Sequence, residues 1–272
     1  MPMALLTALV ASAAETQHSC GPCSTGVQEF VSAAHPKAGR TSDKVTFHTY
    51  QHMYGIFLAP LRNRATPVKL FEIGLGCNMK YGAGASVELW HALLPGLELW
   101  SAEYDVACAQ KAKGSLRQPV HVVTGDQGNA STVEGWIAAS GGHFDAVIDD
   151  GSHRNRDILT SFALLWPHVK PGGFYFLEDL QVGRDASVQS AGGPAVSDVL
   201  QEWMDVLLGT SRQREEGTRR LSSAPPLPVD VESIYCQREA CVLAKTCDGT
   251  NRATRGSCAQ ARTRIERRRL CD

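Results

Sequence analysis

The feature that most constrains the fold of this chain is a regular alternation of strand-like and helix-like segments between residues 68 and 170. Between the strands, apolar residues recur at helical spacing, and glycine or proline ends the helices, as Pro95-Gly96 does after residues 85–94. Strands that alternate with helices form βαβ units with right-handed crossovers, so we expect an α/β domain around a parallel sheet. The predicted strands are residues 68–73, 97–103, 120–124, 144–148 and 174–177.

The alternation stops after residue 178. Residues 196–208 are apolar on one side and predict an amphipathic helix. Two short strand-like runs follow at residues 231–236 and 240–244, with only three residues between them. This spacing is typical of a hairpin, so we expect the last strand to run antiparallel to its neighbour.

The size and composition fit one α/β domain with tails. The chain has 272 residues, of which 43% are hydrophobic and 20% charged. We expect residues 1–40 to be a signal-like or flexible segment, 41–245 the folded domain, and 246–272 a Cys- and Arg-rich tail. The formal net charge of −1 gives no case for binding nucleic acid. No apolar run reaches the ~18 residues that a membrane-spanning helix needs.

A glycine-rich turn follows the first predicted strand. Glu72, Gly74 and Gly76 lie where glycine lets the backbone approach a ligand closely, at the carboxyl edge of a parallel sheet. The dinucleotide fingerprint would need a third glycine at position 79, which is Met79. The turn therefore predicts a nucleotide-like ligand other than NAD.

Carboxylates follow the next three strands as well. Glu103 ends the second strand, where a carboxylate can accept hydrogen bonds from both ribose hydroxyls. Asp126 follows the third strand in a position to meet a base edge, and Asp149 ends the fourth. Each acid alone could be a helix cap or a turn residue. The series as a whole favours a bound nucleoside.

Two acid pairs end the fourth and fifth strands. Asp149-Asp150 and Glu178-Asp179 would repel each other unless a cation or hydrogen-bond donors compensate them, and hard cations such as Mg²⁺ prefer such oxygen ligands. His153 is close enough in sequence to reach the same pocket as a general base. The alternative is that the aspartates are turn or cap residues and that His153 begins a helix.

These residues together resemble the class I S-adenosylmethionine-dependent methyltransferases over about residues 42–245. The resemblance implies a Rossmann-like, doubly wound sheet of seven strands, mostly parallel with an antiparallel last strand, and S-adenosyl-L-methionine as cofactor. A K-P-G-G turn at residues 170–173 also matches the family. The family's cofactor-binding motifs match, in chain order, Glu72, Gly74, Gly76, Glu103, Asp126 and Asp149.

The pattern D-D-G-S-H at residues 149–153 with E-D at 178–179 also resembles the metal-dependent sugar O-methyltransferases of macrolide biosynthesis. The core is similar to the hard-surface-induced proteins of fungi as well. The resemblance implies that Asp150, Glu178 and Asp179 hold a divalent cation such as Mg²⁺, and that His153, beside Asp150, deprotonates the acceptor. A segment before the core is also similar, through Ser42, Asp43, Lys44, His48, Tyr50 and Tyr54.

The resemblance implies O-methylation of a hydroxyl on a small molecule or sugar. In such a reaction the protein aligns an in-line displacement and supplies a deprotonated nucleophile. The alternative is a non-catalytic binding or scaffolding protein with the same fold, which the intact acid pairs disfavour. Homo-oligomerisation stays open at this point.

The nine cysteines and the N-terminus bear on the compartment. Seven cysteines lie outside the middle of the chain, which favours terminal segments pinned by disulfides in an oxidising compartment. Cys236 and Cys241 flank the hairpin turn and could form a cross-strand bridge. Residues 11–13 have the A-x-A pattern of a signal cleavage site. A cytoplasmic protein with reduced thiols and a plain N-terminus is the alternative.

The glycine turn makes a testable distinction between cofactors. We expect S-adenosylhomocysteine to raise the melting temperature and NAD to leave it unchanged, because Met79 replaces the third glycine. Glu103→Ala should weaken S-adenosylhomocysteine binding by ~1–3 kcal/mol, since a hydrogen bond to a charged group is lost. Differential scanning fluorimetry checks both, and stabilisation by NAD alone would contradict the prediction.

Overall fold

The computed structural model describes residues 21–35, 41–80, 82–189, 192–209 and 224–247. The expectations for a signal sequence before residue 21 and for the tail beyond residue 247 lie outside these residues. Within the described ranges, none of the helices combines the length and the apolar character needed to cross a bilayer.

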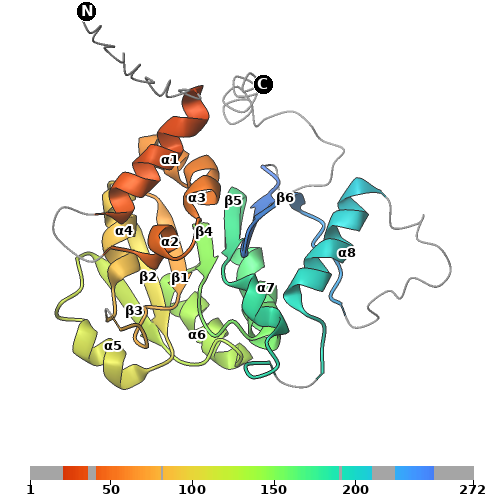
Figure 1. Ribbon diagram of the computed structural model, residues 1–272. Helices are drawn as coiled ribbons and strands as arrows, with labels where there is room; N and C mark the ends of the chain where they lie inside the picture. The colour runs from red at the N-terminus through yellow and green to blue at the C-terminus, as the bar shows by residue number, and fades with distance from the viewer. Residues whose placement is uncertain (1–20, 36–40, 81, 190–191, 210–223, 248–272) are drawn as a thin grey trace, which may run out of the picture.

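Seven strands form one sheet in the order β3-β2-β1-β4-β5-β7-β6 (Figure 1). Strands β1 to β5 pair in parallel, and β7 is antiparallel to both β5 and β6. The predicted architecture is therefore confirmed, including the β6–β7 hairpin, whose last strand lies between β5 and β6. The strands are β1 Lys69–Ile73, β2 Glu98–Glu103, β3 Val120–Thr124, β4 Phe144–Asp149, β5 Val169–Leu177, β6 Val231–Gln237 and β7 Ala240–Lys245.

Helices cover both faces of the sheet, and each face has its own apolar core. Side chains of successive strand residues point to opposite faces, so Leu70 of β1 packs in one core while Phe71 and Ile73 pack in the other. The first core includes residues of α1 Gly21–Ala34, α3 Gln51–Phe57, η1 Ala59–Asn63, α4 Ala85–Leu93 and α5 Val106–Ala112. The second includes residues of α6 Ala130–Ser140, α7 Asn155–Leu165, η2 Trp166–His168, η3 Leu180–Arg184 and α8 Val196–Leu208.

The structure differs from the sequence prediction at residues 21–34, which we expected to be signal-like or flexible. They form α1, and Phe30, Ala33 and Ala34 are buried in the first core. The i, i+3, i+4 spacing of these residues places them on one helical face. The Phe30 ring stacks on Tyr54 of α3, with the ring centroids 5.0 Å apart. The folded unit therefore begins before residue 41.

Two disulfides join described cysteines. The Cys236–Cys241 bridge crosses the β6–β7 hairpin between residues paired in register, as predicted. The second bridge joins Cys77 to Cys108, in the middle of the chain. The sequence did not predict this second bridge, which forms because the loop after β1 and the first turn of α5 meet at the carboxyl edge of the sheet. Cys247 is also disulfide-bonded.

Two glycines bring the backbones of α1 and α3 into contact. A Cβ atom added to Gly26 would lie 2.1 Å from the carbonyl oxygen of Gly55, and one added to Gly55 would lie 2.7 Å from the amide nitrogen of Val27. These distances are far below a van der Waals contact. Any larger residue at either position must push the two helices apart.

We expect Gly55→Ala to lower the free energy of unfolding by about 1–3 kcal/mol, because the added methyl group overpacks the α1–α3 contact. The matched control is Gly135→Ala in α6, where the glycine is exposed and an added Cβ would meet no atom within 4 Å. This control should raise the free energy of unfolding by about 0.5–1 kcal/mol through helix propensity. Urea unfolding checks both, and equal effects of the two substitutions would refute the packing argument.

Candidate active site

The glycine turn lies at the carboxyl end of β1, next to the end of β4. Gly74 has φ +106° and Gly76 has φ +79°, in the left-handed region that favours glycine. A Cβ atom on Gly74 would lie 2.1 Å from the carbonyl oxygen of Asp150. Only glycine lets the turn pass this close to β4, so the turn leaves the sheet with its backbone exposed to a ligand.

Glu103, at the end of β2, is buried against the same turn. Its Oε2 accepts hydrogen bonds from the backbone amides of Leu75 at 3.2 Å and Cys77 at 3.4 Å. Its Oε1 accepts one from the amide of Asp105 at 2.9 Å. A carboxylate has about four lone-pair sites, so Glu103 retains capacity for a ligand hydroxyl. The structure thus brings together Gly74, Gly76 and Glu103, as the prediction required.

Asp126 and Asp149 lie differently from the expectation of two ligand-facing acids. Asp126 is exposed and accepts a hydrogen bond from the amide of Gly128 at 2.8 Å, which is the turn role weighed as its alternative. Asp149 is only 2% exposed, and its carboxylate accepts hydrogen bonds from Gln127 and from Ser161 at 2.6 Å. Burial raises the pKa of Asp149, and Ser161 and Gln127 oppose this. The Asp149 carboxylate therefore links the end of β4 to Gln127 and to Ser161 of α7 inside the protein.

Glu72 is also turned into the protein. It accepts hydrogen bonds from Ser86 Oγ at 2.8 Å and from Trp90 Nε1 at 2.9 Å, and these bonds tie β1 to α4. Burial raises the pKa of Glu72 to about 7, although the Lys44 charge lowers it. Glu72 thus supports the glycine turn from below, and no described contact directs its carboxylate to the open edge.

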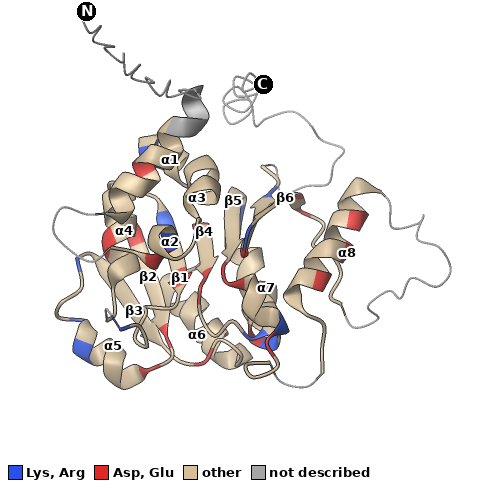
Figure 2. Ribbon diagram, in the orientation of Figure 1, with Lys and Arg blue, Asp and Glu red and all other residues tan. Residues whose placement is uncertain are grey.

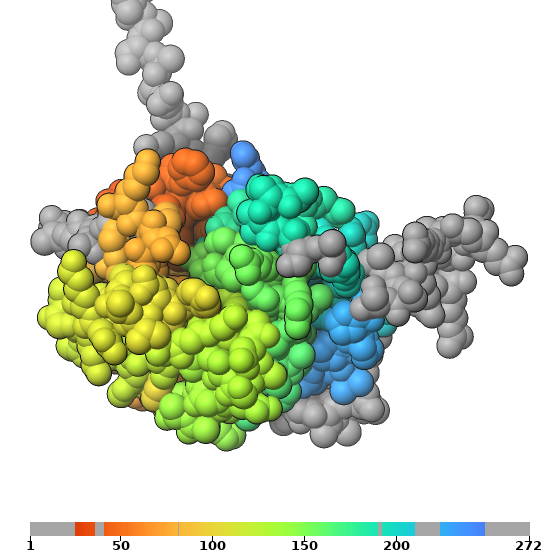
Figure 3. All heavy atoms as spheres, turned by 90° about the horizontal axis from the view of Figure 1, so that it is seen from below, coloured from red at the N-terminus to blue at the C-terminus, as the bar shows by residue number. Residues whose placement is uncertain are grey.

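The charges of Asp150 and Glu178 are compensated by Lys44. Its Nζ lies 2.7 Å from Asp150 Oδ2 and 2.7 Å from Glu178 Oε2, and it is buried above the Trp90 ring. Burial alone would lower the pKa of Lys44, but the two carboxylates raise it well above its ordinary value. This lysine comes from the short helix α2 Asp43–Thr46, marked blue in Figure 2. Figure 3 shows how a lysine from this part of the chain can reach these acids, because N-terminal segments, in orange, lie beside green segments from the middle of the chain.

Glu178 lies outside the group of Asp150, His153 and Asp179 whose potential ligand atoms lie within 4.8 Å of one another. Its Oε2 is paired with Lys44, and its Oε1 accepts a hydrogen bond from the hydroxyl of Tyr54. Burial and the charge of Asp150 raise the pKa of Glu178 well above its ordinary value. The predicted ligand set placed Glu178 at the cation, whereas the structure turns its carboxylate towards α2 and α3.

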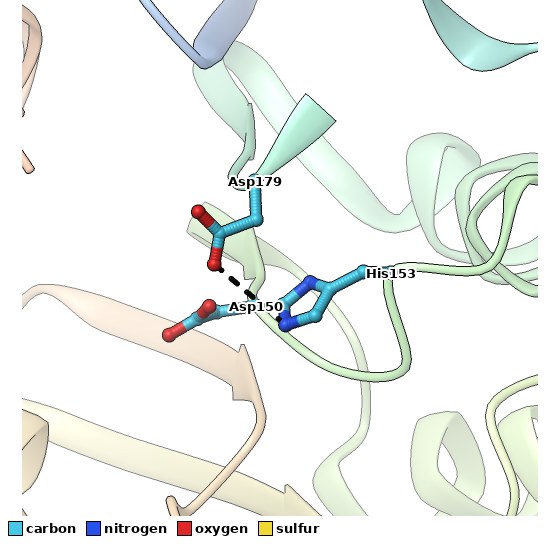
Figure 4. A group of neighbouring side chains, drawn as sticks. All are labelled: Asp150, His153 and Asp179. Carbon is cyan, nitrogen blue, oxygen red and sulfur yellow. Dashed lines mark ion pairs between the residues drawn. The ribbon is translucent and has the colours of Figure 1, made fainter. Parts of the chain in front are cut away.

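Asp150, His153 and Asp179 converge at the edge of the sheet (Figure 4). One potential ligand atom from each lies within 4.8 Å of the others, and His153 Nε2 is 3.7 Å from Asp179 Oδ2. Within the described residues, the buried Nδ1 of His153 has no hydrogen-bond partner. His153 and Asp179 both have left-handed backbones, with φ +56° and +53°. Such conformations in residues other than glycine concentrate at functional sites.

A second layer of side chains positions Asp179. Its Oδ1 accepts hydrogen bonds from the Tyr50 hydroxyl at 2.8 Å and from Gln181 at 3.0 Å. His48 Nε2 lies 3.5 Å from the same oxygen, while His48 Nδ1 lies 2.9 Å from Glu239 Oε2 in the β6–β7 turn. Burial raises the pKa of Asp179, but Gln181, His153 and Tyr50 outweigh this and lower it. Asp179 is thus held as a carboxylate.

Sequence reasoning missed roles for Lys44, Tyr54 and Glu239. Lys44 and Tyr54 belong to a segment that resembles other proteins, but the sequence alone indicates no partner for either side chain. Lys44 is 106 residues from Asp150 and 134 from Glu178, and no local pattern links such positions. Glu239 belongs to the predicted hairpin turn, where an acid is ordinarily a solvated residue. The unbalanced charge of the two acid pairs was the one signal that a buried cation was needed.

The raised pKa of Glu72 makes stability depend on pH. The folded state binds this proton more tightly than the unfolded state does, so the contribution of Glu72 is complete below about pH 4.5 and is lost as pH rises through about 7. Glu72→Gln does not titrate, and its amide can still accept from Trp90 and donate to Ser86. We expect the free energy of unfolding of the original protein, relative to Glu72→Gln, to fall by about 2–3 kcal/mol between about pH 5 and about pH 8. Urea unfolding measures this difference, and a constant difference would contradict the prediction.

No family model matches the sequence, but individual relatives do. The 8-demethyl-8-alpha-L-rhamnosyl tetracenomycin-C 2'-O-methyltransferase of Streptomyces olivaceus is 37% identical over 153 residues, which are 55% of this chain and 38% of that protein. The 8-demethyl-8-(2-methoxy-alpha-L-rhamnosyl)-tetracenomycin-C 3'-O-methyltransferase of the same organism is 34% identical over 218 residues, or 76% of this chain and 52% of that protein. The chain thus spans about half the length, or less, of the curated relatives it matches.

Among solved structures, the fold is similar to that of the MycE methyltransferase from the mycinamycin biosynthetic pathway, in complex with Mg, SAH and mycinamycin VI. The TM-score is 0.59 at 22% identity, and the match covers 87% of this chain and 57% of that chain. In fold the chain is thus similar to this methyltransferase, and in sequence it is similar to the O-methyltransferases named above.

Proposed function

We propose that this protein is an S-adenosylmethionine-dependent O-methyltransferase that methylates a hydroxyl of a sugar or other small molecule with the help of a divalent cation. The observation that carries the proposal is the convergence of Asp150, His153 and Asp179 at the edge of the sheet where the glycine turn and Glu103 also lie. The rhamnosyl substrates named for two relatives support a sugar as the acceptor.

The glycine turn and Glu103 form the cofactor side of the proposed site. The backbone of Gly74 and Gly76 is open to close approach, and Glu103 can accept hydrogen bonds from ribose hydroxyls beyond those it already accepts. Gly74 also touches the backbone of Asp150. A cofactor on this turn would therefore lie next to the acidic cluster, as an in-line methyl transfer requires.

Asp150 and Asp179 form the cation side. Their carboxylates supply the oxygen ligands that Mg²⁺ or Mn²⁺ prefers, and His153 lies beside them, with one potential ligand atom of each of the three residues within 4.8 Å of the others. When bound, the cation would lower the pKa of a nearby hydroxyl and orient two neighbouring oxygens. Lys44 keeps Asp150 turned to this edge, and Tyr50 and Gln181 do the same for Asp179.

His153 is the proposed general base. Its Nε2 faces the acidic cluster, and Asp179 Oδ2 at 3.7 Å stabilises the imidazolium that forms when Nε2 takes a proton from the acceptor hydroxyl. The hydroxyl oxygen then forms a bond to the methyl carbon as the carbon–sulfur bond of the cofactor breaks. A purely scaffolding protein would have no need for this strained, partly buried pair.

Binding measurements separate the two halves of the site. We expect Asp150→Asn to lose Mn²⁺ binding while it keeps S-adenosylhomocysteine binding, because the cofactor half lies on Gly74, Gly76 and Glu103. His153→Ala should keep S-adenosylhomocysteine binding and lower the rate of methyl transfer by ~10²–10⁴-fold. Asp185→Asn, at an exposed turn, is the matched control and should change neither.

Isothermal titration calorimetry measures the binding, and transfer of labelled methyl from S-adenosylmethionine to methyl rhamnosides or other sugar hydroxyls measures the rate. Activity should vanish in EDTA and return with Mg²⁺ or Mn²⁺. Full activity in EDTA would remove the cation from the proposal, and failure of S-adenosylhomocysteine to bind the unmodified protein would overturn it altogether.

A further inference from the structure

The Cys77–Cys108 disulfide joins the same two segments that Glu103 joins by hydrogen bonds. Cys77 directly follows Gly76 in the turn after β1, and Cys108 lies in the first turn of α5. Glu103 Oε2 accepts from the amides of Leu75 and Cys77 on the turn, while its Oε1 accepts from the amide of Asp105, the N-cap residue of α5. The disulfide therefore closes a ring around the carboxylate that is expected to meet the ribose.

Two short backbone hydrogen bonds hold the ends of the turn, from the Gly74 amide to the Ala102 carbonyl oxygen at 2.8 Å and from the Gly84 amide to the Leu75 carbonyl oxygen at 2.9 Å. The contacts between the turn and Glu103 are weaker. The bonds from the Leu75 and Cys77 amides to Glu103 are 3.2 and 3.4 Å long, at and beyond the long end of the usual N–H···O range. Residues 78–80 are exposed, and the Met79 side chain adds little packing to the turn because 40% of its surface is accessible. Glycines at positions 74, 76, 82 and 84 give the free turn many alternative conformations. The disulfide is thus the strongest constraint on the middle of the turn, at residues 76–80.

We infer that the Cys77–Cys108 disulfide is a positioning element of the cofactor site, which holds the glycine turn against Glu103. The inference rests on the proposed function, because it concerns the affinity for an S-adenosylmethionine-type cofactor. Without the bridge, the turn populates open conformations in which the Cys77 amide leaves the carboxylate, while Leu75 stays buried in the first core. The apparent affinity then falls in proportion to the closed fraction. The bridge joins the turn after β1 to α5, whereas Asp150 and Asp179 of the cation side follow β4 and β5.

The two described disulfides offer a matched comparison. We expect Cys77→Ser/Cys108→Ser to raise the Kd for S-adenosylhomocysteine roughly tenfold or more, as a closed fraction of about a tenth would require. Cys236→Ser/Cys241→Ser, on the hairpin at the opposite end of the sheet from β2 and β3, should leave that Kd unchanged. Calorimetry gives the Kd, and the melting temperature without ligand is recorded for each protein. A bridge that only stabilises the fold would lower the melting temperature and leave the Kd unchanged, which would overturn the inference.

Reduction of the folded protein provides a second measurement that does not depend on the folding of a variant. Each disulfide reacts with one molecule of a dithiol reagent, gives two cysteine thiols, and leaves the reagent as a cyclic disulfide. Cys77 and Cys108 are partly exposed and so are accessible to the reagent. The dithiol should raise the Kd for S-adenosylhomocysteine in the Cys236→Ser/Cys241→Ser protein and should leave it unchanged in the Cys77→Ser/Cys108→Ser protein.

The outcomes distinguish this inference from the proposed function. If the unreduced, unmodified protein does not bind S-adenosylhomocysteine, the proposed function fails and the inference fails with it. If every protein binds with the same Kd before and after reduction, the proposed function stands and the positioning role is wrong.

Discussion

Asp150 and Glu178 end two neighbouring strands, and both carboxylates pair with the ammonium of Lys44 at 2.7 Å. The effective cost of burying an ionised group in a protein interior is several kcal/mol, and two acids side by side also repel each other. One cation buried against both offsets these costs. The edge of the sheet can therefore be strongly acidic while β4 and β5 remain well packed. Asp179 and the open side of Asp150 are then left for a ligand.

The two halves of the site are linked through the backbone. Gly74 lies on the cofactor side, and its α-carbon faces the carbonyl oxygen of Asp150 on the cation side, with no space for a side chain between them. Glu103 fixes the turn from β2, while Asp149 fixes β4 from the core through Gln127 and Ser161. The relative position of the cofactor turn and the acidic cluster is thus set by the sheet itself.

The sequence was informative where function and fold follow from local patterns. Alternating strands and helices predicted the parallel sheet, and the strand-end positions predicted that Glu103 lies at the glycine turn and that Asp150, His153 and Asp179 lie close together. The sequence did not predict which way each acidic side chain faces. Asp149 and Glu178 lie at strand ends as expected. Because the side chains of adjacent residues in a strand point to opposite sides, one acid of each pair faces the interior. Their partners, Ser161 and Lys44, lie on helices that no spacing rule connects to these strands.

The helix that carries Lys44 precedes the first strand, and it contributes the one buried ammonium described among these carboxylates. The βαβ core therefore encodes the acids but not their counter-ion. A core of this kind, joined to a different N-terminal segment, would keep its fold pattern and its glycine turn. Its strand-end acids would then have to be neutralised by protons or by metal. Exchange of that short segment between related proteins is thus a route by which one sheet could acquire a different charge, and with it a different preference for cations and acceptors.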